Sequence, residues 1–205
     1  MATVAAAIKL WETKEEPGED GEPGIPNGAA SDAVWMKLYA QMPPITKMDA
    51  SLATLSNCER LALSTNAIDR IGSLAGMSKL KILSLGRNVI KKIEKLEDVA
   101  GTLEELWISY NNITVLDGLG SCQNLTNLYL SNNQIKNWAE LDKLKANPNL
   151  RDLLLVGNPI YDEFEYAQCR IEVLKRLPDL AKIDGDMVKP GERDLAVEQM
   201  AAIEA

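Results

Sequence analysis

Residues 103–113 read LEELWISYNNI, and their alternation of aliphatic and other side chains is typical of an extended strand. Successive side chains of a strand point to opposite faces, so Leu106 and Ile108 face one way and Trp107 faces the other. The aliphatic pair is typical of a core. Trp107 is then a large apolar ring on the face that water should reach, and its position needs a reason.

The same pattern recurs along the chain, in CERLALSTNAI (58–68), LKILSLGRNVI (80–90), LTNLYLSNNQI (125–135) and LRDLLLVGNPI (150–160). Each segment fits L-x-x-L-x-L-x-x-N-x-I, with Cys58 replacing the first leucine. The asparagines stand at positions 66, 88, 111, 133 and 158, in steps of 22, 23, 22 and 25 residues. This spacing predicts a leucine-rich-repeat array. It is an α/β solenoid, because each unit supplies a short strand of a parallel sheet and then a returning segment.

After each asparagine an apolar residue recurs at every third position, as in Ile90, Ile93, Leu96 and Val99. This rhythm favours short 3₁₀ or irregular helical returns on the convex side of the solenoid. The asparagine amides are predicted to turn inward and to bond backbone groups in the bends, because both amide ends form hydrogen bonds. We therefore interpret the asparagine column as structural.

Four regions are expected. Residues 1–42 are N-terminal helical segments, namely a short helix over 3–11, a flexible acidic insert over 12–30, and a second helix over 31–42 that stops at two prolines. Residues 43–165 are the repeat array, with a degenerate first unit at 45–55. Residues 166–185 are a C-terminal cap over the last repeat. Residues 186–205 are an acidic helical tail that projects beyond the cap.

The charge of the chain, −8 in total, lies at its two ends. Residues 1–42 hold seven acidic and three basic residues, 184–205 hold six and two, and 43–183 hold seventeen of each. Binding to nucleic acid needs a clustered positive surface, so no nucleic-acid partner is predicted. No stretch of about 18 apolar residues is present, and no basic leader precedes an apolar segment, so we expect a cytoplasmic protein without a membrane contact.

The composition disfavours catalysis. Histidine is absent, which removes the usual general base and the commonest metal ligand. The three cysteines, Cys58, Cys122 and Cys169, are far apart and set among core residues, so we expect reduced, structural thiols. No phosphate-binding loop, nucleophile motif or metal-ligand spacing is found. We predict no enzyme activity, no cofactor and no metal.

The outward-facing positions of the strands carry the functional signal. The fifth position of successive repeats reads Ala62, Ser84, Trp107, Tyr129, Leu154. Strands lie about 4.8 Å apart, so the last three residues form an apolar row of roughly 10 Å. We predict a partner-binding surface made of Ile82, Trp107, Tyr129, Leu154, Val156, Arg87 and Tyr110, the last two at the strand-to-turn edge. The alternative is that the N-terminal helix covers this row, but that helix is needed to cap the first repeat.

A basic run comprising Arg87, Lys91, Lys92 and Lys95 continues into the return of the second of these segments. It is interpreted as a solvated surface that Glu94, Glu97 and Asp98 balance. A contact with an acidic partner is the other interpretation.

The segments PPITKMDASLATL, LSLGRNVIKKIEKL, TLEELWISYN and RIEVLKRLPDLAKIDG resemble the leucine-rich-repeat light chains of axonemal outer-arm dynein. The resemblance covers about residues 43–185 and does not extend to the acidic insert or the tail. It implies a non-catalytic subunit of the axoneme of cilia and flagella, part of the cytoskeleton. It also implies two partners, a dynein heavy chain, contacted at the microtubule-binding end of its stalk, and tubulin.

Carried over to this chain, the heavy-chain contact falls on Ile82, Trp107, Tyr129, Leu154 and Val156. The basic positions near the C terminus correspond loosely to Lys189 and Arg193. We list Lys91, Lys92, Lys95, Lys189 and Arg193 as residues expected to lie near a microtubule. Two other functions stay open: a regulatory subunit of a phosphatase, and a scaffold in a ribonucleoprotein complex such as the spliceosome.

Overall fold

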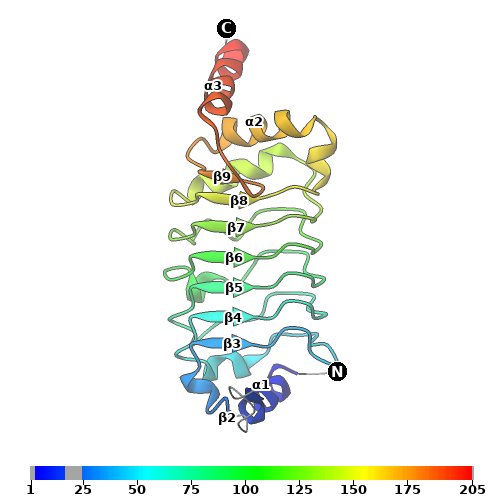
Figure 1. The fold of residues 1–205 in the computed structure, drawn as a ribbon, viewed down its shortest axis with the longest axis vertical. Coiled ribbons are helices and arrows are strands. Elements are labelled where there is room, and N and C mark those ends of the chain that lie inside the picture. The colour runs from blue at the N-terminus through cyan, green and yellow to red at the C-terminus, as the bar shows by residue number, and fades with distance from the viewer. Residues whose placement is uncertain (1–2, 17–24, 205) are drawn as a thin grey trace, which may run out of the picture.

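A single long sheet organises the chain in the computed structural model, which describes residues 3–16 and 25–204 (Figure 1). The strand order is β10-β9-β8-β7-β6-β5-β4-β3, and the pairs from β3 to β9 are parallel. The strands are β3 (Trp35–Lys37), β4 (Arg60–Ala62), β5 (Ile82–Ser84), β6 (Glu105–Trp107), β7 (Asn127–Tyr129), β8 (Asp152–Leu154), β9 (Lys182–Ile183) and β10 (Asp186–Met187). The predicted α/β repeat solenoid is confirmed.

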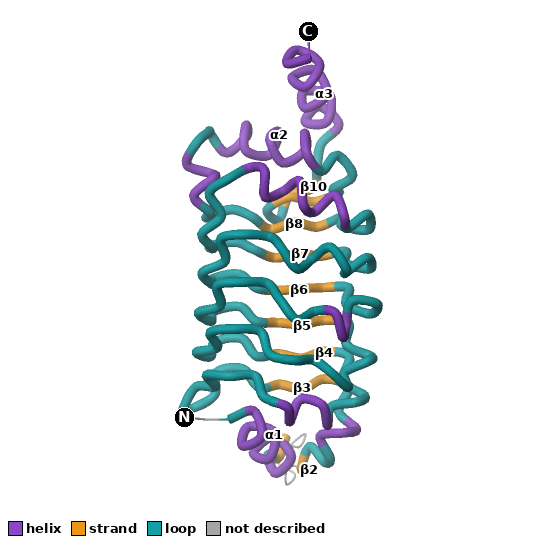
Figure 2. Tube along the Cα trace, turned by 180° about the vertical axis from the view of Figure 1, so that it is seen from behind, coloured by secondary structure: helices purple, strands orange, loops and turns teal. Residues whose placement is uncertain are grey.

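The returns run behind the sheet (Figure 2). Most are irregular, and 3₁₀ turns occur at η2 (Ala30–Asp32), η3 (Ala50–Thr54), η4 (Glu97–Val99), η5 (Trp138–Ala146) and η6 (Pro159–Asp162). This agrees with the three-residue apolar rhythm, because 3₁₀ turns align side chains three positions apart. No helix in the described part of the chain is both long and apolar enough to cross a bilayer.

The interior is made of stacked leucine, isoleucine and asparagine columns. Asn111 is representative: its amide nitrogen donates to the carbonyl oxygens of Leu85 and Ile108, each at 3.0 Å, and its Oδ1 accepts from the N–H of Ile90 at 2.9 Å. Each asparagine thus ties its own repeat to the preceding one, as predicted. The three cysteines, Cys58, Cys122 and Cys169, are buried and unpaired, and burial raises the pKa of each thiol.

The predicted helix over 31–42 is wrong, because this segment is the first repeat of the array. β3 pairs with β4 in parallel register, Trp35 opposite Arg60. Met36 and Leu38 are buried, while Trp35 is exposed, which is strand periodicity rather than helical periodicity. An asparagine at this point of a repeat bonds the repeat before it, and no repeat precedes this one among the described residues, which accounts for the missing asparagine.

At the N-terminal end, α1 (Val4–Thr13) packs against η2 and η3. The segment predicted to be a flexible insert is held at both of its ends. β1 (Glu15–Glu16) pairs antiparallel with β2 (Ile25–Pro26), and the side-chain amide of Asn27 donates to the Trp11 carbonyl oxygen at 2.8 Å. The central part of that insert, residues 17–24, lies outside the described residues.

At the C-terminal end, α2 (Tyr166–Arg176) covers the last repeat and buries Cys169, Val173 and Leu174. α3 (Pro190–Glu204) packs against α2 as far as Gln199, whose side chain bonds that of Gln168, and its end extends away from the body (Figure 1). The buried guanidinium of Arg170 holds the two helices together, because it binds both carboxylate oxygens of Glu192, at 2.6 and 3.0 Å.

Candidate docking surface on the sheet

An apolar row crosses the outer face of strands β6 to β8. The register places Trp107 beside Tyr129, and Tyr129 beside Leu154. The rings of Trp107 and Tyr129 are stacked, with centroids 5.9 Å apart and planes inclined by 25°. Trp107 is 39% exposed, whereas its neighbour Leu106 is fully buried, so the ring lies on the solvent face of the strand as predicted.

Acidic side chains hold the polar edges of this row. The indole N–H of Trp107 donates to Oε2 of Glu105 at 2.9 Å, and the hydroxyl of Tyr129 donates to Oδ2 of Asp152 at 3.2 Å. Partial burial, together with the carboxylate of Asp152, raises the pKa of the Tyr129 phenol. Both rings are therefore oriented before any partner arrives, which lowers the entropic cost of binding.

The flanking residues extend the row in part. Ile82 is half-buried on β5, and Val156 is 37% exposed just beyond β8. The strands toward the N-terminal end offer small side chains at the equivalent positions, Ala62 and Ser84. α1 packs below β3 at the N-terminal end of the solenoid, so it does not cover the row (Figure 1). Among the described residues, no segment of the chain provides the cover that was considered as an alternative.

Arg87 and Tyr110 meet at the edge of the sheet, where the guanidinium of Arg87 lies 4.3 Å from the centroid of the Tyr110 ring. Both residues have left-handed backbone conformations, with φ of 56° and 58°. Their N–H groups donate to the carbonyl oxygens of Ser109 and Ser131, so the next repeat fixes each bend. The pair forms a polar rim beside the apolar row.

A second exposed aromatic site was missed by the sequence reasoning. Trp35 and Tyr39, 49% and 52% exposed, lie on and just beyond β3, and the ammonium of Lys37 lies 4.6 Å from the Trp35 ring. The signal was present, because Ala33, Met36 and Leu38 have the spacing of the other repeats. The missing asparagine concealed it.

The basic candidates separate into two kinds. Lys91, Lys92 and Lys95 are exposed, and within the described residues they form no ion pair, not even with the acids that were expected to balance them. Lys189 is also exposed. Arg193 differs: its guanidinium donates to the carbonyl oxygens of Pro178 and Leu180, so it fastens α3 to the cap.

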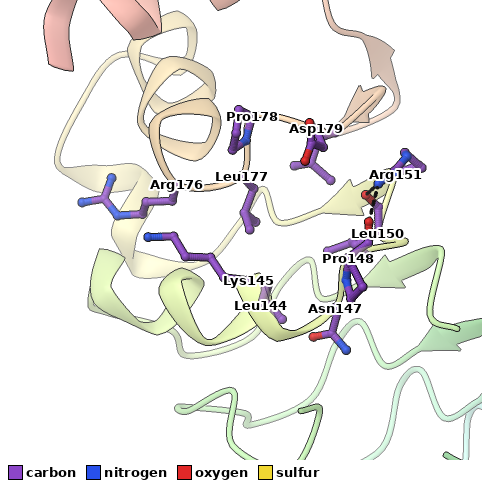
Figure 3. A pocket seen from close by; sticks show the side chains of 11 residues that line it. Leu144, Lys145, Asn147, Pro148, Leu150, Arg151, Arg176, Leu177, Pro178 and Asp179 are labelled. Carbon is purple, nitrogen blue, oxygen red and sulfur yellow. Dashed lines mark hydrogen bonds between the residues drawn. The ribbon is translucent and has the colours of Figure 1, made fainter. Parts of the chain in front are cut away.

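A small cavity of about 130 Å³ lies between η5 and the end of α2 (Figure 3). Its cations are already engaged: Lys145 pairs with Asp142, Arg176 with Glu172, and Arg151 donates to the carbonyl oxygens of Pro148 and Leu150. Oδ1 of Asn147 is buried without a partner, but its side chain points away from the cavity and donates into the preceding repeat (Figure 3). The cations that line this cavity are therefore not available to a ligand.

Comparison with known proteins identifies relatives along nearly the whole chain. A family profile described as "Leucine Rich repeats (2 copies)" matches residues 102–143. The "Dynein axonemal light chain 1" of Chlamydomonas reinhardtii is 50% identical over 198 residues, which cover 95% of this chain and 94% of that protein. The protein of the same name from Homo sapiens is 48% identical over 193 residues, covering 94% and 96%.

Among solved structures, the "Crystal structure of Drosophila melanogaster SNF/U2A' complex" aligns over the full length of both chains with a TM-score of 0.56. The identity is 18%, so this likeness supports the fold alone. By contrast, the light chains are about 50% identical to this chain over nearly its whole length. The chain belongs to the dynein axonemal light chain 1 family.

Proposed function

We propose that this chain is a non-catalytic light chain that binds an axonemal dynein heavy chain through the outer face of its sheet, with Trp107 as the central anchor. Membership of the light-chain family supports a structural role in the axoneme, within the cytoskeleton of the cilium or flagellum. The observation that carries the proposal is the exposed Trp107 ring, stacked on the half-buried ring of Tyr129 on the outer face of the sheet.

The energetics favour this face. Trp107 is 39% exposed, and the partly exposed side chains of Tyr129, Leu154 and Val156 lie beside it in one contiguous apolar patch. Contiguous apolar patches rimmed by polar groups are typical of interaction sites. Aromatic residues are also enriched among the few that supply most of the binding energy at an interface. The Arg87–Tyr110 rim surrounds the row with groups that can bond polar atoms of the partner.

The heavy-chain stalk, near its microtubule-binding end, is the proposed docking position, and the light chain there modulates the grip of the motor. The microtubule contact is assigned to the exposed cations Lys91, Lys92 and Lys95, with Lys189 as a weaker candidate. A chain of net charge −8 is not drawn to an acidic lattice from a distance. Docking on the heavy chain would hold these cations close to the lattice and raise their effective concentration.

Capture from detergent-extracted cilia tests the proposal. Immobilised wild-type light chain should retain a dynein heavy chain, and Trp107→Ala should lose most of it. Trp35→Ala is the matched control, because it removes the same exposed ring from the far end of the same face. Equal retention by wild type and Trp107→Ala, or equal losses in both variants, would refute the assignment of the anchor.

A further inference from the structure

We propose that a basic strip on the flank of the solenoid binds an extended acidic polypeptide segment. The strip consists of Lys47, Arg70, Lys91, Lys92, Lys95 and Lys136. These residues follow the turns of the first, second, third and fifth repeats, so they lie away from the outward face of the sheet. The sequence reasoning identified only the central lysines, because Lys47, Arg70 and Lys136 are more than twenty residues from one another along the chain.

Three open hollows of about 310, 350 and 440 Å³ join along this strip. Arg70 lines the first and second hollows, and Lys91 with Lys92 lines the second and third. Because neighbouring hollows share these side chains, the three adjoin one another as a row, here called the groove, from Lys47 in the first repeat to Lys136 in the fifth.

The backbone turns that carry these cations are held by hydrogen bonds between repeats. The N–H of Val89 donates to the carbonyl oxygen of Ile68 at 3.0 Å, and the N–H of Asn112 donates to that of Ile90 at 2.8 Å. The amide oxygens of Asn88 and Asn111 accept from the N–H groups of the same two isoleucines. Because this ladder repeats from one unit to the next, the cations that follow it are held in register.

The strip is positive within an acidic chain. Lys47, Lys91, Lys92, Lys95 and Lys136 form no ion pair among the described residues, and only Arg70 has one, with Asp69 at 3.6 Å. Three acidic residues line the hollows, Asp49, Asp69 and Glu94, against six cations. The carboxylate of Asp49 is already occupied by the N–H groups of Val4 and Ser51. The groove therefore has cations in excess.

An acidic polypeptide fits this chemistry better than the other polyanions. Asn112, Thr114 and Gln134 line the third hollow, and their side chains can bond a peptide backbone as both donors and acceptors. None of the residues lining the three hollows is aromatic, whereas single-stranded nucleic acid is usually held by stacking on aromatic rings. None is a large exposed apolar side chain of the kind that inserts into a lipid surface.

The length of the ligand follows from the repeat spacing. Four repeat steps of about 4.8 Å separate Lys47 from Lys136, or roughly 19 Å. An extended chain advances about 3.3 Å per residue, so about six residues span the strip. The groove thus suits a short glutamate-rich segment in an extended conformation.

The inference goes beyond heavy-chain docking, which uses the outward face of the sheet rather than this flank. It shares Lys91, Lys92 and Lys95 with the proposed microtubule contact, and on that point it rests on the proposed function. Its test needs no dynein and no microtubule, so failure of this inference and failure of docking are distinguishable.

Fluorescence anisotropy of labelled peptides tests it with the full chain. Peptides of three, six and nine glutamates should bind with affinity that rises up to about six residues and then levels off, and a glutamine peptide should not bind. Raising the salt from low to above physiological concentration should weaken binding about tenfold, because the Debye length falls below about 8 Å. The double variant Lys91→Glu/Lys92→Glu should lose at least about tenfold in affinity.

A matched double variant, Lys9→Glu/Lys14→Glu, makes the same change in net charge at two exposed positions outside the strip and should bind as wild type does. Lys91→Gln/Lys92→Gln should give an intermediate loss, and a thermal melt of each variant confirms that it folds. Three outcomes would overturn the inference: no binding by wild type at low salt, equal losses in the two charge-reversal variants, or tighter binding to an oligonucleotide or to vesicles of anionic lipid than to the six-glutamate peptide.

Discussion

The two faces of the same short strands follow different rules. Leu83, Leu106 and Leu128 occupy one interior column, are buried, and are identical in three successive repeats. The outward column beside it reads Ser84, Trp107 and Tyr129, and changes at every step. Repetition marks what each repeat needs in order to stack on the next, whereas departure from repetition marks where the chain can do something particular.

The largest expected loss of stability is at Asn111, on the buried side of the repeats. Asn111→Ala removes an amide that bonds three buried backbone groups, and each group left without a partner costs about 1–3 kcal/mol. We expect a loss of about 3–5 kcal/mol in the free energy of unfolding, measured by urea denaturation. The neighbouring Asn112→Ala, at an exposed position, is the control and should change stability by less than about 0.5 kcal/mol. Similar losses in the two variants would contradict the account of the ladder.

The second prediction concerns the C-terminal end of the array, where α3 is held on the cap helix α2. Glu192→Gln removes the carboxylate that Nε and Nη2 of the buried Arg170 bind. Breaking such a pair typically costs about 3 kcal/mol of stability. The effect should appear as faster amide exchange in α3, with the repeat array unchanged. Glu198→Gln, at an exposed position of the same helix, should leave exchange as it is. Unchanged protection of α3 in Glu192→Gln would show that other contacts hold this helix.

Acid should release the same contact. The hydrogen bonds from Arg170 lower the pKa of Glu192, so the stability they supply is present above its ordinary pKa of about 4.3. That stability is lost as the pH falls through the lower value of the folded state. Amide exchange in α3 should therefore accelerate below about pH 4, and Glu192→Gln should lack this transition. Acceleration at the same pH in both proteins would assign the change to another carboxylate.

The smallest expected change in stability is at Thr65, in the turn that follows strand β4. Thr65 has a left-handed backbone, with φ of 57°, which is strained for a β-branched residue. We expect Thr65→Gly to stabilise the chain by up to about 1 kcal/mol, because glycine adopts this conformation without steric cost. Thr114→Gly, at an exposed position with no left-handed backbone, should be neutral or destabilising. A loss of stability in Thr65→Gly would mean that its side chain contributes more than the strain costs.

Most of the solenoid could be predicted from the sequence because stacking constrains the interior strongly. The five asparagines, the aliphatic columns and the cap over Cys169 and Val173 each leave a periodic signal. The first repeat was not recognised, because it lacks an asparagine and therefore resembled a helix between a polar cap and two prolines. The spacing of Ala33, Met36 and Leu38 was its local signal, and its strand is fixed by long-range pairing with Arg60 and its neighbours.

The candidate surface was predictable in part for the same reason. The row of Trp107, Tyr129 and Leu154 follows directly from the repeat register. The pairing of Arg193 with the cap carbonyls, and the absence of ion pairs at Lys91 and Lys92, depend on side-chain positions that no spacing specifies. The residues of the basic strip are far apart in the sequence, and they form one surface only because the repeats stack.

The most direct test of the central claim compares Leu106→Ala with Trp107→Ala, two neighbours on opposite faces of β6. Leu106→Ala should destabilise the chain by about 2–5 kcal/mol, because it leaves a cavity in the core. Trp107→Ala should cost about 1 kcal/mol of stability, because it loses mainly the stacking of the partly exposed ring on Tyr129. It should nevertheless weaken binding to a purified heavy-chain stalk-tip domain by about 2 kcal/mol or more, roughly thirtyfold in Kd. A melting temperature for Trp107→Ala as low as that of Leu106→Ala, or binding as tight as that of wild type, would contradict the assignment of this face as the docking surface.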